Sequence, residues 1–387
     1  MRYLDYNAGA PLRPEVAAHL GSAFPGSDGN PSSVHQAGRA ARRRLDAARE
    51  AVAATLGCTP REVIFTGSGS EAAALAVLGA FRGRKDQARK RIVTSALEHP
   101  CVLGAMALLE QEGAEVVRVR PGPDGRVSAE AMIAALGPAT CACSLLWVNN
   151  ETGVIQPVPE LARACAAKGI VFHTDAVQAV GKLPATLREA PADLFSFSAH
   201  KLGGPAGVGA LTVRRGTALQ PLVPGHQEDG RRGGTQGVVM AEALALALAL
   251  ATAEQAAESA RLTALRDRFE RELSAKLPGV TVNGGGAPRA CNTSNLRVDG
   301  ADGEAVLIAL DLEGICVSTG AACASGSLKP SHVLLAMGLT SAQAHASLRI
   351  SFGKGSTDAD VDAAVDALAR HIPRTLDHPL PGVAGRG

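Results

Sequence analysis

Residues Cys141-Ala-Cys-Ser-Leu-Leu-Trp-Val148 form an almost entirely apolar run, and Asn149-Asn150-Glu151 follow it directly. A short apolar run that is bounded by polar residues is typical of a strand buried on both faces of a sheet. Outward from this run, six other short segments are similarly rich in strand-forming residues. They are Glu62–Thr66, Arg91–Ser95, Glu115–Val119, Ile170–Asp175, Asp193–Ser198 and Gly209–Val213.

Segments of helical period separate most of these runs. They are Ser70–Phe81, Pro100–Glu112, Ala129–Ala135 and Glu160–Lys168. Strands that alternate with helices predict an α/β fold with a mostly parallel, seven-stranded sheet that is covered on both faces. A short Gly-rich link, without a helix, joins the last two runs, which is compatible with one antiparallel pairing.

The character of the sequence changes after Thr235. A helical stretch rich in Ala and Leu runs to about Lys276, and a Gly- and Pro-rich break, short strands and further helices follow it. This pattern predicts a second, smaller α+β domain. We assign residues 15–255 to the large domain, and residues 1–14 together with 256–387 to the small domain.

The composition is that of a globular protein, because 46% of the residues are hydrophobic and 20% are charged. A formal net charge of +2 gives no argument for nucleic acid or a membrane surface as a partner. The chain shows neither an apolar run of the roughly 18 residues that span a bilayer nor the apolar core of a signal peptide. We therefore expect a cytoplasmic protein. The cysteines are scattered and argue against a disulfide framework, and we interpret all except Cys323 as small hydrophobic residues.

Polar and titratable side chains follow five of the predicted strands. Ligands of open parallel sheets bind beyond the carboxyl ends of the strands. Each group alone could be a helix cap or a satisfied buried polar residue, but so many together are hard to explain by packing. The five groups are Gly67-Ser68-Gly69-Ser70, Glu98-His99-Pro100, Asn149-Asn150-Glu151, His173-Thr174-Asp175-Ala176-Val177-Gln178 and Ser198-Ala199-His200-Lys201.

These side chains suit the parts of pyridoxal 5'-phosphate (PLP). A phosphate binds at a helix N-terminus with hydroxyl groups, which Ser70 offers, and Ser198 and His200 add donors. A carboxylate keeps a pyridine nitrogen protonated, and Asp175 supplies one. An aldehyde needs an amine to form an imine, and Lys201 supplies it.

Three further side chains suit the ring of the cofactor. Asn150 and Gln178 carry amides that can donate to a ring hydroxyl, and His99 offers a flat partner for the ring face. The structural alternative for Lys201 is a surface lysine, and its place at the end of an apolar strand argues against that alternative. The sequence therefore predicts a PLP site in which the cofactor is an electron sink for carbanions.

The chain resembles the cysteine desulfurases, which are PLP enzymes of fold type I and class V, over nearly its whole length. The segment around Cys323 resembles the iron–sulfur-cluster and nitrogen-fixation type. The motifs that carry the resemblance are Tyr3-Leu-Asp-Tyr-Asn-Ala8, Gly29-Asn-Pro-Ser-Ser-Val-His35, Phe65-Thr-Gly-Ser-Gly-Ser-Glu71, Val148-Asn-Asn-Glu-Thr-Gly153, His173-Thr-Asp-Ala-Val-Gln178, Ser196–Gly204, Arg232-Gly-Gly-Thr235 and Ser318–Pro330.

The resemblance implies further roles. His99 moves protons in addition to stacking on the ring, and Gly69 joins the serines at the phosphate. Thr235 reaches the phosphate of the other subunit's cofactor, which implies an obligate homodimer. Arg349 pairs with the substrate carboxylate, for which its bidentate geometry is well suited, and Asn30 assists it.

Cys323 is the expected nucleophile. Small residues surround it, and an exposed, flexible thiol is a poor structural choice but a good mobile nucleophile. The resemblance implies that its thiolate attacks the sulfur of PLP-bound L-cysteine, which leaves L-alanine and a persulfide on Cys323. The sulfur then passes to an acceptor protein such as an iron–sulfur scaffold. Any metal contact of Cys323 is a transient contact with a cluster through the persulfide.

Two other functions stay open from the sequence. One is a selenocysteine lyase or another class V PLP enzyme that acts at an amino acid β-carbon, and Cys323 argues against those that need no persulfide. The other is a PLP-binding scaffold or regulator with little turnover. Departures from the usual family residues at Ala73, Ala74 and Ala206 leave cofactor affinity and dimer contacts open.

Overall fold

The computed structural model describes residues 1–26, 29–319 and 329–377. Its large sheet has the strand order β2-β8-β7-β6-β5-β3-β4, and all neighbouring pairs are parallel except the two that involve β8. The predicted seven-stranded, mostly parallel sheet is therefore confirmed. The strands are β2 (Val63–Thr66), β3 (Arg91–Ser95), β4 (Glu115–Val119), β5 (Thr140–Ser144), β6 (Val171–Asp175), β7 (Leu194–Ser198) and β8 (Gly209–Val213).

Two details of the sheet differ from the prediction. Strand β8 lies between β7 and β2 and runs antiparallel to both, so there are two antiparallel pairings where the sequence suggested one. Strand β5 ends at Ser144, although the apolar run continues to Val148. Residues 145–148 leave the ladder with β3 but stay buried, and Trp147 N still donates to Asp175 O at 2.9 Å. Burial continues past the end of the ladder, so apolar composition does not mark where the strand stops.

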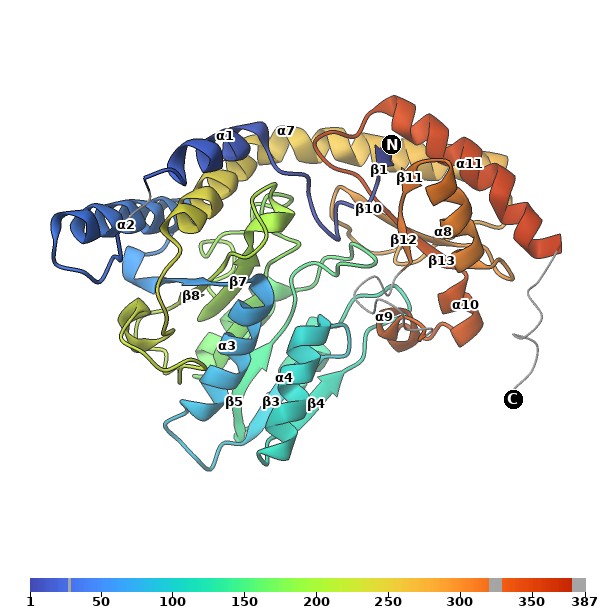
Figure 1. Ribbon diagram of the computed structural model, residues 1–387. Coiled ribbons are helices and arrows are strands. Elements are labelled where there is room, and N and C mark those ends of the chain that lie inside the picture. The colour runs from blue at the N-terminus through green and yellow to red at the C-terminus, as the bar shows by residue number, and fades with distance from the viewer. Residues whose placement is uncertain (27–28, 320–328, 378–387) are drawn as a thin grey trace.

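Helices cover both faces of this sheet (Figure 1). Buried side chains of α3 and α4 pack together on one face, and those of α5, α6, α2 and the first part of α7 belong to a second core. The helices are α1 (Pro14–Ala23), α2 (Gln36–Leu56), α3 (Gly69–Arg82), α4 (Pro100–Gln111), α5 (Ala129–Ala135), α6 (Val158–Ala167) and α7 (Val238–Lys276).

A smaller group of elements follows α7 (Figure 1, right). Its antiparallel sheet has the order β12-β13-β10-β9, and α8 and α11 pack with this sheet around a separate core. Near it, the N-terminal strand pairs with β11 in parallel. The elements are β1 (Arg2–Tyr3), β9 (Thr281–Val282), β10 (Thr293–Arg297), α8 (Gly303–Leu312), β11 (Ile315–Cys316), β12 (Ser318–Thr319), α9 (His332–Ala336), α10 (Ser341–His345), β13 (Ser347–Ser351) and α11 (Asp358–Asp377).

Helix α7 runs through both parts of the molecule (Figure 1). Its residues up to Ala251 pack in the core of the large sheet, and its residues from Leu262 onward pack in the core of the small one. A domain boundary near residue 255 stays a prediction, and this change of core supports it. Among the described residues, α7 is the one helix long and apolar enough to cross a membrane, but its buried side chains make it a core helix.

Candidate active site

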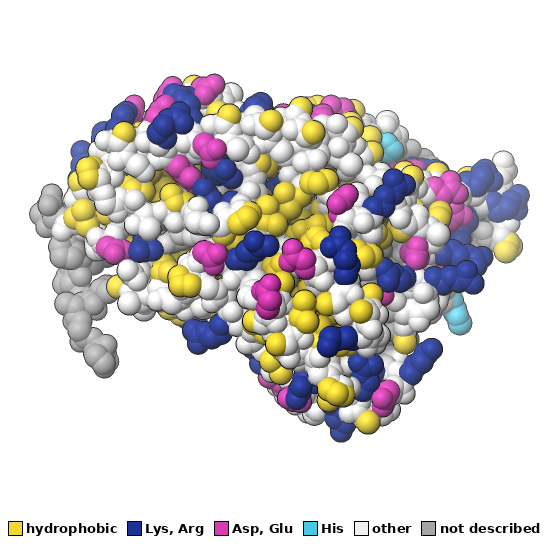
Figure 2. Space-filling model, turned by 180° about the vertical axis from the view of Figure 1, so that it is seen from behind, with side chains coloured by type: hydrophobic (Ala, Val, Ile, Leu, Met, Phe, Trp, Pro, Cys, Tyr) yellow, Lys and Arg dark blue, Asp and Glu magenta, His cyan; other side chains and the backbone are white. Residues whose placement is uncertain are grey.

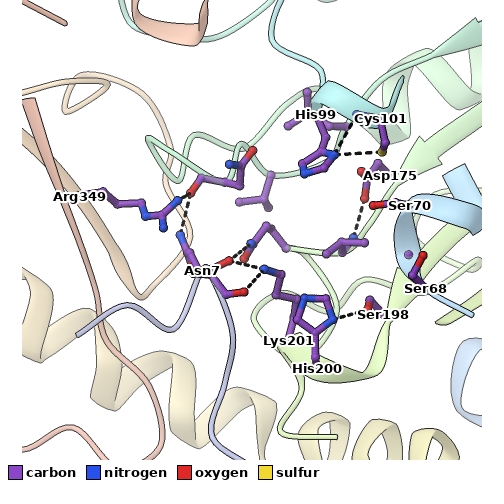
Figure 3. A pocket seen from close by; sticks show the side chains of 17 residues that line it. Asn7, Ser68, Ser70, His99, Cys101, Asp175, Ser198, His200, Lys201 and Arg349 are labelled. Carbon is purple, nitrogen blue, oxygen red and sulfur yellow. Dashed lines mark hydrogen bonds between the residues drawn. The ribbon is translucent and has the colours of Figure 1, made fainter. Parts of the chain in front are cut away.

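A cavity of about 340 Å³ opens at the carboxyl ends of the central strands. The strand ends of the large sheet, the N-terminal segment and β13 all contribute to its wall (Figure 3). Asn30 and Thr235 are exposed and lie outside the lining, and Cys323 lies outside the described residues. The predicted site residues that the structure brings together here are Gly69, Ser70, His99, Asn150, Asp175, Gln178, Ser198, His200, Lys201 and Arg349.

The N-terminus of α3 forms one end of the cavity. Ser68 is the N-cap of this helix, and its Oγ accepts from Glu71 N at 3.0 Å. The other N–H groups of a first helical turn have no partner within the helix and attract an anion. A Cβ added at Gly69 would lie 2.9 Å from the Ser198 Cβ and 3.0 Å from the Val177 Cγ2. Glycine therefore keeps open a small space beside these N–H groups.

Ser198 and His200 lie at the same end of the cavity. The Ser198 Oγ and the His200 Nδ1 are 2.6 Å apart. Burial lowers the pKa of His200 to about 4, with a further contribution from the charge of Lys201. The ring of His200 is therefore neutral near pH 7, and it would contact an anion as a hydrogen-bonding group and not as a cation.

Asp175 is a buried carboxylate at the end of β6. Its Oδ1 accepts from Val177 N at 2.9 Å. Burial raises the pKa of Asp175, and the charges of His99 and Lys201 oppose this shift. A cationic ring nitrogen placed against the carboxylate would stabilise its charged form. Burial also lowers the pKa of His99, the facing side chain.

The backbone carbonyl groups of the N-terminal segment hold Lys201. Its Nζ donates to Asn7 O at 2.5 Å and to Ala8 O at 2.7 Å. Gln178 Nε2 donates to the same Asn7 carbonyl at 3.0 Å. The sequence placed neither Asn7 nor Ala8 in the site, because they follow none of the predicted strands. The motif Tyr3–Ala8, which contains both residues, was the sequence feature that could have indicated their place in the site.

A second lysine, Lys182, lies behind Lys201 and was also missed. Its Nζ donates to Asn7 Oδ1 at 3.0 Å and to Gln178 Oε1. Gln178 thus directs its amide oxygen to Lys182 and its NH2 group to the Asn7 carbonyl. This orientation supports the predicted role of Gln178 as a donor. Burial lowers the pKa of Lys182 to about 7.

Arg349 reaches the cavity from β13 of the small sheet (Figure 3). Only 2% of the residue is exposed. Its Nη2 donates to Asp5 Oδ1 at 2.7 Å and its Nη1 donates to Asn150 O at 3.1 Å. Its buried Nε has no hydrogen-bond partner among the described residues. A guanidinium group held in this way is a preorganised binding group for a carboxylate.

Cys101 packs as a small hydrophobic residue against the core between α3 and α4, and it also faces the cavity. The side chain lines the cavity, and its Sγ lies 3.0 Å from the His99 Nδ1 (Figure 3). This position could not be predicted from the sequence, because Cys101 follows Pro100 in an apolar helical segment.

Two hydrogen bonds attach the residues after the Cys323 segment to the wall of the site. Ser331 Oγ donates to the buried Glu151 Oε2, and the His332 Nε2 lies 3.0 Å from Glu98 O. Burial raises the pKa of Glu151 to about 7. Ser331 and His332 are thus held beside the strand ends that carry Asn150 and His99.

The cavity has the parts that PLP needs. The space beside Gly69 at the α3 N-terminus fits a phosphate, and the buried Asp175 fits a cationic ring nitrogen. Lys201 supplies the amine for the aldehyde, and Gln178 presents amide donors.

Comparison with known proteins agrees with this geometry. Residues 2–364 match the family described as aminotransferase class V, so the chain belongs to that family. Enzymes of this family depend on PLP. Among its relatives, a cysteine desulfurase of Cereibacter sphaeroides is 43% identical over 95% of this chain and 94% of its own length. An IscS-like cysteine desulfurase of Mycobacterium tuberculosis is 42% identical over 97% of both chains. A solved structure described as a NifS-like protein has a TM-score of 0.88 and 31% identity, over 96% of this chain and 99% of its own.

Proposed function

We propose that this protein is a cysteine desulfurase, which removes sulfur from L-cysteine and leaves L-alanine and a persulfide on Cys323. The observation that carries the proposal is a single cavity in which Lys201, Asp175 and His99 of the large domain face Arg349 of the small domain. When PLP is bound, it supplies an electron sink at the substrate Cα.

The residues of the large domain hold the cofactor in this proposal. The α3 N-terminus with Gly69 and Ser70 binds the phosphate, together with Ser198 and His200. Asp175 stabilises the charge on the ring nitrogen, and Asn150 and Gln178 donate to the ring hydroxyl. Lys201 is the amine that binds the aldehyde, and its release from the carbonyls of Asn7 and Ala8 frees it for that bond.

The substrate binds between the two domains. Arg349 binds its carboxylate. Before the substrate binds, the contact with Asp5 keeps the guanidinium group directed at the cavity. Asn30 assists the binding. His99, which lines the cavity, moves the protons of the substrate.

Cys323 completes the reaction. Its thiolate forms a bond to the substrate sulfur while the Cβ–S bond of the substrate breaks. The electron pair of the broken bond stays with the substrate, which takes up protons and leaves as L-alanine. The sulfane sulfur then passes to an acceptor protein such as an iron–sulfur scaffold, and any contact of Cys323 with a cluster is transient.

We further propose a cytoplasmic homodimer. Thr235 is exposed and lies outside the cavity, as expected of a residue that serves the cofactor of a second subunit. Figure 2 shows apolar side chains gathered in the middle of one face of the molecule. An exposed apolar area of this kind often marks a contact with another chain.

An assay of the purified, PLP-loaded protein tests the proposed function. With L-cysteine and a thiol reductant, we expect sulfide and alanine in equal amounts. The Cys323→Ala variant should lose this activity and keep the absorption of bound PLP. Turnover of L-selenocysteine without turnover of L-cysteine, or full activity of Cys323→Ala, would contradict the proposal.

A further inference from the structure

Lys182 lies beside the active-site cavity without lining it. It lines a separate, smaller cavity of about 100 Å³ on the other side of Lys201, which lines both. The amine of Lys182 donates to two side-chain amide oxygens, Asn7 Oδ1 at 3.0 Å and Gln178 Oε1. Both of these amide residues line the active-site cavity. Lys182 can therefore act on the site through its neighbours.

The backbone of Lys182 is attached to α7. Its carbonyl oxygen accepts from Gln255 Nε2 at 3.1 Å and from Ser259 Oγ at 2.7 Å. Helix α7 belongs to both cores of the molecule, so it is a firm support. The amine is thus held in place from behind.

The amide of Asn7 does not depend on Lys182. Its Oδ1 also accepts from Asn292 Nδ2 at 3.1 Å. Its Nδ2 donates to Asn150 O at 3.0 Å and to Thr293 Oγ1 at 2.8 Å. These bonds fix Asn7 even when the bond from Lys182 is removed.

The amide of Gln178 has fewer partners. Its Nε2 donates to Asn7 O at 3.0 Å, and because a carbonyl group only accepts, the amide oxygen must face Lys182. Among the described residues, Lys182 is the one donor to this oxygen. The second hydrogen of the NH2 group has no acceptor among those residues, and Gln178 lines the cavity. This hydrogen is available to a ligand.

We propose that Lys182 is a positioning residue for Gln178: its N–H donates to the amide oxygen, and this bond keeps the NH2 group in place to donate to the ring hydroxyl of PLP. Gln178 is only 5% exposed, so without Lys182 its oxygen would be buried without a donor. Such a group is destabilising, and the side chain would turn toward another partner. The inference rests on the proposed PLP site and desulfurase function.

The charge of Lys182 does not decide this role. Burial lowers its pKa to about 7, Cys291 opposes the shift, and the charge of Lys201 adds to it. A charged amine has three N–H groups and a neutral amine has two, so either form can make both bonds. At about pH 9 the amine is neutral, and a substitution then removes hydrogen bonds but no charge.

The test is a double-mutant cycle on PLP affinity, measured at about pH 9 by titration of the apoprotein. Lys182→Met keeps the apolar chain and removes the donor, and Gln178→Ala removes the amide. We expect each variant to bind PLP about threefold to tenfold more weakly, which is the effect of one hydrogen bond. In the Gln178→Ala background, Lys182→Met should cause no further loss.

Lys354→Met is the matched control. Lys354 lines the same small cavity as Lys182, but its amine pairs with Glu254. This variant should bind PLP as the parent protein does.

Two further readouts separate positioning from a general loosening of the fold. Lys182→Arg keeps N–H donors, and the small cavity has room for the extra atoms, so it should bind PLP more tightly than Lys182→Met. A donor to the ring oxygen stabilises negative charge there. The pH at which the absorption of bound PLP changes should therefore rise in Lys182→Met, as in Gln178→Ala.

Unchanged PLP affinity in Lys182→Met would overturn the inference. A loss of the same size in the Gln178→Ala background would overturn it too, because Lys182 would then act on the fold and not on Gln178. A parent protein that shows the expected affinities but releases no sulfide from L-cysteine would instead overturn the proposed function.

Discussion

At the scale of single residues, two lysine amines near the site could each be the one that binds the aldehyde of PLP. Lys201 and Lys182 both donate to Asn7, and burial lowers the pKa of Lys182 to about 7, which makes it a nucleophile near neutral pH. Only Lys201 lines the cavity that contains Asp175 and the α3 N-terminus. Position, and not basicity, is therefore the reason why we propose Lys201 as the residue that binds PLP.

The first prediction follows from this choice. Borohydride reduction of the PLP-loaded protein, followed by peptide mass spectrometry, should find the cofactor on Lys201. Lys201→Ala should abolish the labelled peptide and the desulfurase activity. Lys182→Ala is the matched control and should keep the label on Lys201. A label that appears on Lys182 in the parent protein would contradict the assignment.

Gly69 leads to a second prediction. An alanine here would put its Cβ 2.9 Å from the Ser198 Cβ, so the wall of the phosphate site must shift. We expect Gly69→Ala to weaken PLP binding about tenfold or more, because overpacking of this kind costs about 1–3 kcal/mol. Gly104→Ala provides the control: it lies in α4 with open space around it, and should stabilise the helix by about 0.5–1 kcal/mol. Equal PLP affinity of the two variants, measured by titration of the apoprotein, would rule out the phosphate site.

At the scale of elements, the loop that carries Thr235 is held by a buried ion pair. Glu228 has a fully buried side chain and forms two hydrogen bonds with Arg49, and its carboxylate also accepts from Phe65 N and Gln236 Nε2. Both Glu228 and Asp229 have a positive φ, which few residues other than glycine adopt. The carboxylate thus holds a strained turn against α2 and β2.

A third prediction tests this anchor. Glu228→Ala leaves Arg49 buried without its partner and should lower the free energy of unfolding by about 3–5 kcal/mol. Glu112→Ala removes an ion pair with Arg82 in which both side chains are about one third exposed, and it should cost no more than about 1 kcal/mol. Urea unfolding of both variants measures the difference. Similar losses would show that the turn does not depend on Glu228.

The helices and strands also show how much of the site could be predicted from the sequence. The strands and their polar ends were predictable, because residues such as Asp175 and Lys201 lie at the end of an apolar strand or within three residues of it. Asn7 was not, because it enters the site through β1 and through its hydrogen bond to Ser351, a contact distant in the chain. Cys101 was hidden for another reason, since a cysteine in an apolar helix has the composition of a core residue.

At the scale of the whole molecule, the proposed dimer predicts a complementation. Thr235→Val should lower activity, because it removes a phosphate ligand from the site of the other subunit. A mixed dimer of Lys201→Ala and Thr235→Val subunits contains one site with an intact Lys201 and with Thr235 of the partner subunit. Co-expression of the two variants should therefore restore part of the activity. No recovery in a confirmed mixed dimer would place Thr235 in its own subunit's site or outside any site.

The same scale gives the reason for proposing that the substrate binds between the large sheet and the small one. Arg349 comes from the small sheet, and Lys201, Asp175 and His99 lie at the strand ends of the large one. Ser331 and His332 attach the chain after the Cys323 segment to the wall of this site. Ser331 follows Cys323 by eight positions in the sequence, and Cys323 itself lies outside the described residues.

Mass spectrometry of the intact, PLP-loaded protein after addition of L-cysteine without reductant tests the central claim most directly. We predict a mass gain of one sulfur atom, located on the Cys323 peptide, lost on treatment with a thiol, and absent from Cys323→Ala and Lys201→Ala. Release of sulfide from L-cysteine while Cys323 stays unmodified, or a gain located on Cys101, would contradict the account.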